Sequence, residues 1–292
     1  MSQHVFQAPT TGREISNREK LLRPVPMPSL KSVAILVVLL LLLIWGASST
    51  GANFQTLAEG IPNIWDFLTR LFPFQFVMVD WRINFFGNQL SWNVPEAIPA
   101  LVETVQMAIV GTVGAVLLSL PFGFLAARNI TPHPVVYFLT RFSLNVNRAV
   151  PDIIFALIFV SAVGLGPFAG ILALTIGSIG TAAKMYAESI ESIDPAQIQA
   201  VRATGANELK VFSFAVMPQA LPLIASYSLL MFEGNVRSAS ILGIVGAGGI
   251  GLILNKYMAL FKYQELMGAL LLIIVLVTII DRVSDAIRRR IV

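Results

Sequence analysis

The 292-residue sequence has no cysteine, only two histidines and a charged fraction of only 12%. Without cysteine the chain cannot form a disulfide, a thiolate nucleophile or a cysteine-ligated metal site. The histidines, His4 and His133, are too few and too far apart to predict a metal site or a proton relay. No convergent catalytic set is visible either, so we expect a chain that is not an enzyme and holds no metal or cofactor of its own.

The low charged fraction indicates a membrane protein. Soluble domains carry about twice as many charged residues, whereas this chain is 56% hydrophobic with a mean hydropathy of +0.77. Three long stretches hold no charge at all, namely residues 104–127, 153–183 and 211–232. Runs of about 18 or more apolar residues predict membrane spans, and helices satisfy their own backbone groups in lipid. The predicted fold class is therefore an all-α integral membrane protein.

The apolar runs predict about six transmembrane helices. We place them at residues 33–46, 98–127, 150–163, 168–187, 218–240 and 266–287. Residues 1–31 form a polar tail. Residues 32–95 hold the first helix and an aromatic-rich connection, which we expect at the membrane–water interface with a short amphipathic helix. Residues 96–292 form a five-helix core, in which 128–148 is a basic connection and 188–217 is a polar interruption.

The basic residues predict the orientation in the membrane. If the amino-terminal tail lies in the cytoplasm and the helices alternate, 15 of the 20 lysines and arginines fall on the cytoplasmic side. Positively charged loops favour that side. Both termini are therefore predicted to be cytoplasmic, which requires an even number of spans and agrees with six. This placement accounts for the net charge of +4 without a nucleic-acid partner.

The polar interruption at 188–217 is the most informative segment. Asp194 and Pro195 predict a helix start, because aspartate caps a helix and proline fits its first turn. Gly205 suits a helix end, and Pro218 suits the start of the next membrane helix. The segment is too polar to span the membrane, so it predicts a short helix on the cytoplasmic face, between the fourth and fifth spans.

The same segment resembles the coupling motif of permease subunits in bacterial ABC importers. That motif reads Glu-Ala-Ala, three residues, Gly, nine residues, Ile, one residue and Leu-Pro. Here Gln199-Ala200-Val201 stands for its first three residues, while Gly205 and Pro218 keep the expected separation. Other segments resemble permeases for phosphonate and related phosphorus oxyanions. They are Asn147–Asp152, Gly164–Pro167, Met185–Glu191, Glu233–Ala239 and Leu242–Gly251.

The resemblance implies a type I ABC importer permease in the bacterial inner membrane. In that family two copies of the permease form the pathway, two cytoplasmic ATPase subunits drive it with ATP and Mg²⁺, and an extracytoplasmic binding protein delivers the substrate. The sequence has no phosphate-binding loop of the form Gly-x4-Gly-Lys-Ser/Thr, so ATP hydrolysis would belong to the partner. The motif assigns coupling to the ATPase to Gln199, Ala200, Val201, Arg202, Gly205 and Pro218.

Polar residues in the fifth predicted helix are candidates for the translocation pathway. Glu233, Asn235 and Arg237 lie close together, and ionisable groups in a membrane helix usually face a cavity or a partner. Arginine suits phosphoryl oxygens, but an ion pair between Glu233 and Arg237 that only packs the helix explains the same spacing. Both interpretations stay open. Glu103, near the outer end of the second helix, is expected to be solvated.

A glycine-rich stretch follows the fifth helix. Gly246, Gly248, Gly249 and Gly251 include the spacing of a dinucleotide-binding loop, but they follow a membrane helix rather than a strand. We interpret them instead as a close helix approach or a non-helical turn that helps to form an external gate.

Two alternatives to a phosphorus oxyanion importer remain. A permease for another small solute, such as an amino acid or a metal chelate, shares the architecture. A secondary transporter works without ATP, but such proteins often show inverted repeats or a carboxylate relay at the membrane centre. The sequence shows no convincing internal repeat, and its carboxylates cluster near the ends of the predicted spans. The resemblance therefore favours the ATP-driven importer.

Overall fold

The computed structural model describes residues 29–51, 54–85, 88–131 and 133–291. The predicted tail, 1–31, falls almost wholly outside these residues. The chain divides into two compact units, Met1–Asp66 and Phe67–Val292, and each is described by itself.

The first unit contains α2 (Leu30–Ser49) and most of α3 (Phe54–Arg70). α2 is long and apolar enough to cross a membrane, and none of its residues is buried. α3 is strongly amphipathic. Its exposed apolar face consists of Leu57, Ile61, Ile64, Trp65 and Leu68. The first predicted span and the predicted amphipathic helix are thus both present.

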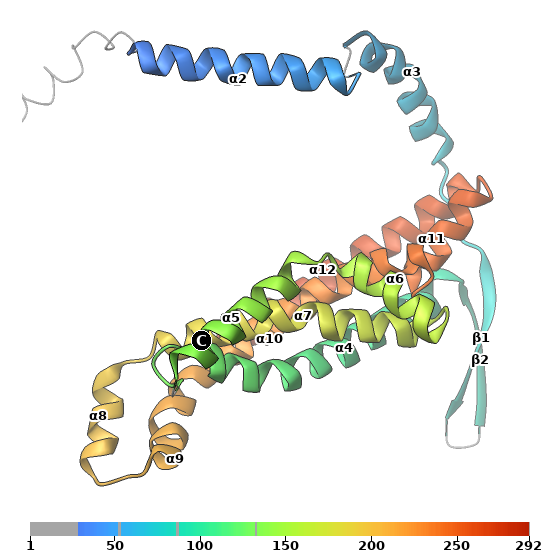
Figure 1. Ribbon diagram of the computed structural model, residues 1–292. Coiled ribbons are helices and arrows are strands. Elements are labelled where there is room, and N and C mark those ends of the chain that lie inside the picture. The colour runs from blue at the N-terminus through green and yellow to red at the C-terminus, as the bar shows by residue number, and fades with distance from the viewer. Residues whose placement is uncertain (1–28, 52–53, 86–87, 132, 292) are drawn as a thin grey trace, which may run out of the picture. The chain divides into compact units, whose positions relative to one another are not determined.

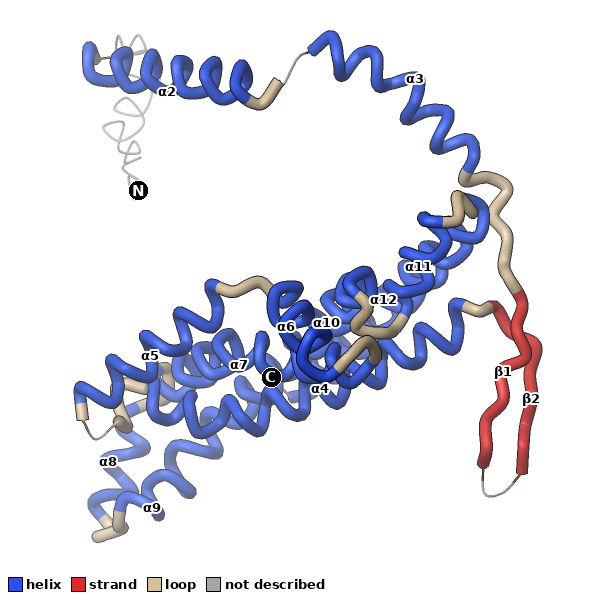
Figure 2. The backbone as a smooth tube through the Cα atoms, turned by 45° about the vertical axis from the view of Figure 1, so that its right-hand side comes forward, coloured by secondary structure: helices blue, strands red, loops and turns tan. Residues whose placement is uncertain are grey.

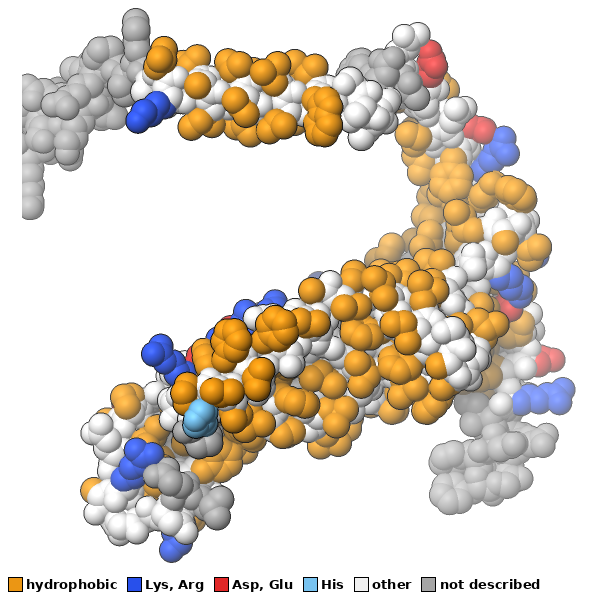
Figure 3. All heavy atoms as spheres, viewed as in Figure 1, with side chains coloured by type: hydrophobic (Ala, Val, Ile, Leu, Met, Phe, Trp, Pro, Cys, Tyr) orange, Lys and Arg blue, Asp and Glu red, His pale blue; other side chains and the backbone are white. Residues whose placement is uncertain are grey.

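The second unit is a helical bundle with a two-stranded hairpin at one end and the short helices α8 and α9 beyond the other (Figures 1 and 2). The helices are α4 (Ala97–Ala126), α5 (Pro134–Ala149), α6 (Asp152–Val163), α7 (Pro167–Glu191), α8 (Pro195–Ala203), α9 (Glu208–Val211), α10 (Met217–Leu242), α11 (Ile250–Ala259) and α12 (Tyr263–Ile291). Large apolar side chains are exposed on α4 and α10 as well as buried between helices, as expected of helices that cross a membrane. On the face shown in Figure 3, hydrophobic side chains cover the middle of the bundle.

The third span is a bent pair of helices. In the described residues, five helices are each long and apolar enough to cross a membrane, and α5 with α6 makes a sixth span if the pair, bent by 84°, is counted as one. The prediction of six spans agrees with this count. The prediction of a connection at 128–148 was wrong for most of its length, because α5 occupies it. The charges of Arg141 and Arg148 led the sequence analysis to interpret this segment as a loop. Pro151 lies at the bend between α5 and α6.

Small residues bring α4 and α7 into close contact. A Cβ atom built on Gly111 would lie 2.8 Å from Cβ of Leu174, and one on Gly123 would lie 2.9 Å from Cβ of Tyr186. Lipid supplies no hydrophobic force between helices, so close packing of small residues holds such bundles together.

Asn147 of α5 inserts its amide into the backbone of α7. The N–H of Gly180 donates to Oδ1 of Asn147 at 2.8 Å, and Nδ2 of Asn147 donates to the carbonyl oxygen of Ile176 at 3.0 Å. In an α-helix the N–H of one residue normally bonds to the carbonyl oxygen four residues earlier, and Gly180 and Ile176 form such a pair. The side chain of Asn147 therefore bonds to both members of this pair and holds α5 against α7.

The aromatic connection holds a structure that the sequence analysis missed. Strands β1 (Met78–Phe85) and β2 (Asn88–Pro95) pair antiparallel, with Trp81 opposite Trp92. The abundance of aromatic residues was interpreted as a preference for the interface, although aromatic residues also favour strands. The hairpin leads into Glu96, which precedes α4.

Replacing Gly180 by alanine should destabilise the bundle. The new Cβ would lie 2.6 Å from Oδ1 of Asn147 and 2.7 Å from the carbonyl oxygen of Leu144. Overpacking of this kind costs about 1–3 kcal/mol, more than the helix propensity gained from alanine. Thermal unfolding of the purified protein in detergent measures the effect. Gly234→Ala is the matched control, because nothing lies within 4 Å of its added atom. Equal stability of both variants would contradict the close packing.

Candidate coupling and translocation sites

α8 forms the polar helix expected between the fourth and fifth spans. Oδ1 of Asp194 accepts a hydrogen bond from the N–H of Ala196 at 2.9 Å, and Pro195 is the first residue of the helix. The helix ends at Ala203, and Gly205 takes a left-handed conformation with φ of +78°. A side chain there is strained whatever space surrounds it. The predicted start and end are therefore confirmed.

α8 turns one edge inward and leaves the rest exposed. Ile198 and Val201 are half-buried, and Ile198 packs against the core at this end of the bundle. The exposed residues include Gln199, Ala200, Arg202 and Gly205, which the motif assigns to coupling. Ala196, Ala200 and Ala203 follow one another at helical spacing on the exposed side. This narrow face of small residues suits insertion between the elements of another protein.

Gln219 connects α8 to the membrane helix α10. Its Oε1 accepts from the N–H of Asp194 at 3.0 Å, and its Nε2 donates to the carbonyl oxygen of Ala215 at 2.7 Å. Pro218, assigned to coupling by the motif, is the second residue of α10. The sequence analysis missed Gln219. In the sequence, the only indication of this contact is an amide side chain directly after Pro218. Its partner, Asp194, lies 25 residues away.

Two further contacts fix this end of the bundle. Oε1 of Glu191 accepts from the N–H of Arg128 at 2.7 Å and from Nη2 of Arg141 at 2.8 Å, so the end of α7 is joined to α4 and α5. A π-helical segment (Phe212–Val216) leads into α10, and the ring of Phe212 packs edge-on against Phe124, with centroids 4.9 Å apart.

Asn235, a candidate for the pathway, lies at a buried junction of three helices. Its Nδ2 donates to Oγ1 of Thr112 in α4 at 2.9 Å, and its Oδ1 accepts from Oγ of Ser178 in α7 at 2.9 Å. The residue is 4% exposed. Both polar atoms of the side chain therefore have partners within the bundle.

Glu233 and Arg237 each pair with α12 instead of with each other. Glu233, whose side chain is 8% exposed, pairs with Nη2 of Arg288. Nη1 of Arg237 lies 3.1 and 3.2 Å from the two carboxylate oxygens of Asp281. The packing salt bridge between neighbours of α10, which the sequence left open, is thus replaced by two bridges between helices.

The glycine-rich stretch forms a tight turn that is anchored to α4. Gly246, Gly248 and Gly249 all have positive φ, and Gly251 follows at the start of α11. The N–H of Gly249 donates to Oε1 of Glu103 at 2.9 Å, and Oγ1 of Thr104 accepts from the N–H of Ile250 at 2.8 Å. Glu103, expected in solvent, is instead half-buried and caps this turn. The turn is specific structure rather than a flexible linker.

An ion pair near the hairpin holds α11 to the start of α4. Nζ of Lys256 lies 2.7 Å from Oε1 of Glu96, and the hydroxyl of Tyr257 donates to Oε2 at 2.9 Å. Burial alone raises the pKa of Glu96, but the hydrogen bonds from Lys256 and Tyr257 outweigh it and place that pKa below its ordinary value. Burial and the neighbouring carboxylate raise the pKa of the Tyr257 hydroxyl.

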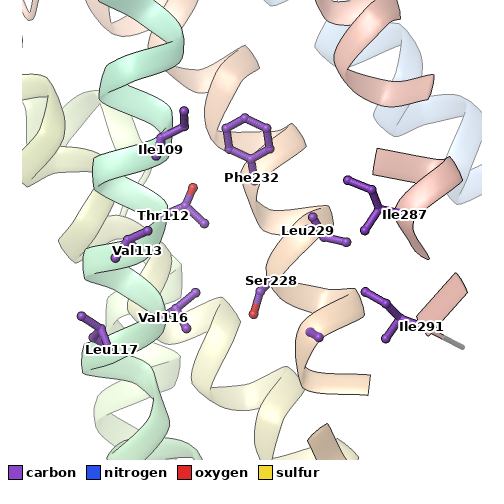
Figure 4. Close-up of a pocket in the computed structure, with 11 residues that line it drawn as sticks. Ile109, Thr112, Val113, Val116, Leu117, Ser228, Leu229, Phe232, Ile287 and Ile291 are labelled. Atoms are coloured by element: carbon purple, nitrogen blue, oxygen red, sulfur yellow. The ribbon is translucent and has the colours of Figure 1, made fainter. Parts of the chain in front are cut away.

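A cavity of about 620 Å³ opens between α4, α10 and α12 (Figure 4). Its lining is Ile109, Thr112, Val113, Val116, Leu117, Ala225, Ser228, Leu229, Phe232, Ile287 and Ile291. The hydroxyl of Thr112 is bound to Asn235, and that of Ser228 is bound to Tyr186 and to the carbonyl of Ile224. A phosphorus oxyanion needs several donors, so this apolar cavity does not suit one. Among the described residues, no cluster of acidic or histidine side chains suits a metal.

The family model of the binding-protein-dependent transport system inner membrane component matches residues 119–292. The chain belongs to this family. The match covers α5 to α12 and thus includes the short helix α8, the polar residues of α10 and the glycine turn. The family is one of transport components of the inner membrane, which accounts for a chain of membrane helices.

Relatives within the family have names that refer to phosphorus compounds. The phosphite transport system permease protein PtxC of Stutzerimonas stutzeri is 38% identical over 89% of this chain and 88% of its own length. The phosphate-import permease protein PhnE of Mycolicibacterium smegmatis is 45% identical over 66% of this chain and 36% of its own length. A permease chain of the inward-facing MetNI methionine ABC transporter has a TM-score of 0.61 and 26% identity, covering 68% of this chain and all of that one.

Removing the carboxylate of Glu103 should loosen the glycine turn. Glu103→Ala leaves the N–H of Gly249 without its acceptor, whereas Glu103→Gln keeps an oxygen in the same place. An unpaired buried donor costs about 1–3 kcal/mol, so amide exchange in 246–251 should become about fivefold faster or more in the alanine variant. Hydrogen–deuterium exchange with mass spectrometry measures this. If all three proteins exchange alike, Glu103 does not hold the turn.

Proposed function

We propose that the chain is the permease subunit of an ATP-driven importer and forms the translocation pathway for phosphonate or a related phosphorus oxyanion. The observation that carries this proposal is α8, a capped helix with an exposed face of small residues that is hydrogen-bonded to a membrane helix through Gln219. Such an element suits a contact through which another protein moves the bundle. The 38% identity with a phosphite permease over most of both chains supports the class of substrate.

The proposed partners follow from this assignment. A second copy of the chain completes the pathway, two cytoplasmic ATPase subunits bind α8 and hydrolyse ATP with Mg²⁺, and an extracytoplasmic binding protein delivers the anion. α8 and the hairpin lie at opposite ends of the bundle (Figure 1), which supports a cytoplasmic position for the first and an outer position for the second. This orientation also places both termini in the cytoplasm, because six spans, with α5 and α6 counted as one, return the chain to the side on which the first span starts.

Mechanical coupling runs from α8 through α10. Closure of the ATPase subunits displaces α8, and the contact between Asp194 and Gln219 passes that displacement to the first turn of α10. α10 is joined to α4 and α7 through Asn235 and to α12 through two ion pairs. Its far end continues directly into the glycine turn, which we propose as part of the external gate. One helix therefore connects the ATPase contact, the middle of the bundle and the gate.

Of the three pathway candidates, Arg237 is the one whose charge is accessible. Its side chain is 49% exposed, whereas Glu233 and Asn235 are buried and bonded within the bundle. We therefore propose Arg237 as the residue that meets the anion, with Glu233 and Asn235 holding α10 in place beside it.

A second candidate function is the import of another small solute such as methionine. The structural similarity to the MetNI permease favours it, as does a probable D-methionine permease of Vibrio cholerae that is 30% identical over 51% of this chain. The phosphite permease matches more of the chain at higher identity. Phosphorus oxyanions therefore remain the proposed substrate.

Recovery of the ATPase with the tagged permease tests the importer. The permease is purified from its bacterial membranes in mild detergent, and associated proteins are identified by mass spectrometry. We expect an ATPase subunit, and at least about tenfold less of it with Ala200→Arg, because that change places a long cation on the exposed face of α8. Ser91→Arg in the hairpin, at the other end of the bundle, is the matched control. A permease that purifies alone and moves phosphate into liposomes without ATP would overturn the proposal.

A second test concerns the conformation at Gly205. Gly205→Val forces a β-branched residue into a left-handed conformation, which costs about 1–2 kcal/mol or more and shifts the end of α8. In reconstituted complexes we expect ATP hydrolysis to continue while uptake per ATP falls severalfold. Gly51→Val is the matched control. Gly51 also has a positive φ, +65°, and open surroundings, but it lies between α2 and α3. Normal uptake by the Gly205 variant would remove this residue from the coupling site.

A further inference from the structure

The ion pair between Arg237 and Asp281 lies level with the middle of the membrane helix α4. Arg237 follows Asn235 by two residues, which is about 3 Å along a helix. Asn235 contacts Thr112, which stands in the middle of the 30-residue helix α4. A helix of that length extends about 45 Å, so its middle residues fall within the hydrocarbon layer of about 30 Å.

At this depth the pair is unusually exposed. The side chain of Arg237 is 49% exposed and that of Asp281 is 40% exposed, whereas Glu233, on the same helix, is 8% exposed. Charges at this depth do not face acyl chains, because lipid cannot solvate them. The surface that holds both residues must therefore face water or a polar surface inside the assembled transporter.

The contact uses only one nitrogen of the guanidinium. Only Nη1 of Arg237 bonds to Asp281, at 3.1 and 3.2 Å, and no other described residue bonds to Nε or Nη2. Charge-assisted bonds are commonly about 2.7–2.9 Å; Lys256 and Glu96 lie 2.7 Å apart, whereas Arg288 and Asp285 lie 3.1 Å apart, as Arg237 and Asp281 do. The guanidinium thus keeps donors that can bind two oxygens of a tetrahedral oxyanion at once.

From this geometry we propose that Asp281 is the counter-ion that the passing phosphorus oxyanion displaces from Arg237. The inference rests on the proposed function. While the pathway is empty, the carboxylate neutralises and orients the guanidinium. During passage the anion takes its place, and the return of Asp281 then releases the anion. The guanidinium is thus paired at every stage, while the displaced carboxylate of Asp281, whose side chain is 40% exposed, lies at the same accessible surface.

The neighbouring acidic residues do not share this role. Glu233 and Asp285 both bind Arg288, to Nη2 and Nη1 respectively, so this second arginine already has both terminal nitrogens bonded. Glu233 is buried as well. Asp285 lies one helical turn beyond Asp281 on α12 and provides a matched control, because its neutralisation removes the same charge without touching Arg237.

The test uses the complete complex, with ATPase subunits and binding protein, reconstituted in liposomes. The probe is ³³P-phosphate, with phosphite and methylphosphonate as unlabelled competitors. Equilibrium binding of the same probe is measured on the permease–ATPase complex without binding protein. Asp281→Asn should bind phosphate about three- to tenfold more tightly, because the competing carboxylate is gone, and turnover at saturation should fall severalfold. Asp285→Asn should match the unmodified protein in both, and Arg237→Ala with Asp281→Asn should behave like Arg237→Ala alone.

The outcomes separate this inference from the proposed function. If Asp281→Asn binds and transports like the unmodified complex while Arg237→Ala loses uptake, the counter-ion role of Asp281 is wrong. The proposal that Arg237 lies in the pathway is then retained. If Asp281→Asn weakens binding and lowers the thermal stability and the recovery of the ATPase, the pair is structural and the inference fails. If the unmodified complex transports none of the three anions, the proposed substrate class fails first.

Discussion

The hydrogen bonds of Asn235 are the contact on which the bundle depends. In the interior of a membrane protein an unpaired amide finds no water, so each of its polar atoms needs a protein partner. Thr112 and Ser178 supply one partner each, from α4 and α7. The three helices are thereby fixed in rotation and in height, because a shift of any one of them would leave a buried group unpaired. Apolar packing alone would tolerate such shifts.

Because Asn235 fixes this junction, the charged residues on either side of it serve different purposes. Glu233 points to Arg288 and is buried, so the pair holds the last turns of α12 against α10. Arg237, one turn from Glu233, faces an accessible surface and is bound to a carboxylate that is itself exposed. A buried pair resists change, since separating it leaves an uncompensated charge. An exposed pair exchanges partners readily. The same helix thus carries one permanent ionic contact and one that can be exchanged.

Local chemistry was predictable from the sequence, whereas pairing between helices was not. The uncharged runs gave the spans, and Asp194, Pro195 and Gly205 gave the limits of α8, because caps and breakers act on adjacent residues. The partners of Glu233 and Arg237 lie 55 and 44 residues away, so the spacing of the two residues on α10 misleadingly suggested a pair between them. The bent span and the hairpin were missed for a related reason. Charges on α5 and aromatic residues in the strands each had a simpler local explanation.

In the proposed coupling, the hydrogen bond from Asp194 to Gln219 matters because α8 is short. A nine-residue helix is too short to be stable by itself, so α8 keeps its orientation through its contacts with the bundle, at Ile198 and at the cap residue Asp194. Gln219 bonds to the residue that caps α8 and to the backbone of the π-helical segment. π-Helical turns occur where a helix accommodates an extra residue, often at functional sites. A push on α8 would therefore reach α10, which Asn235 joins to α4 and α7, across this π-helical segment. In the proposed coupling, the contacts of Asn235 hold the middle of α10 in place, while the π-helical segment lies between that fixed part and α8.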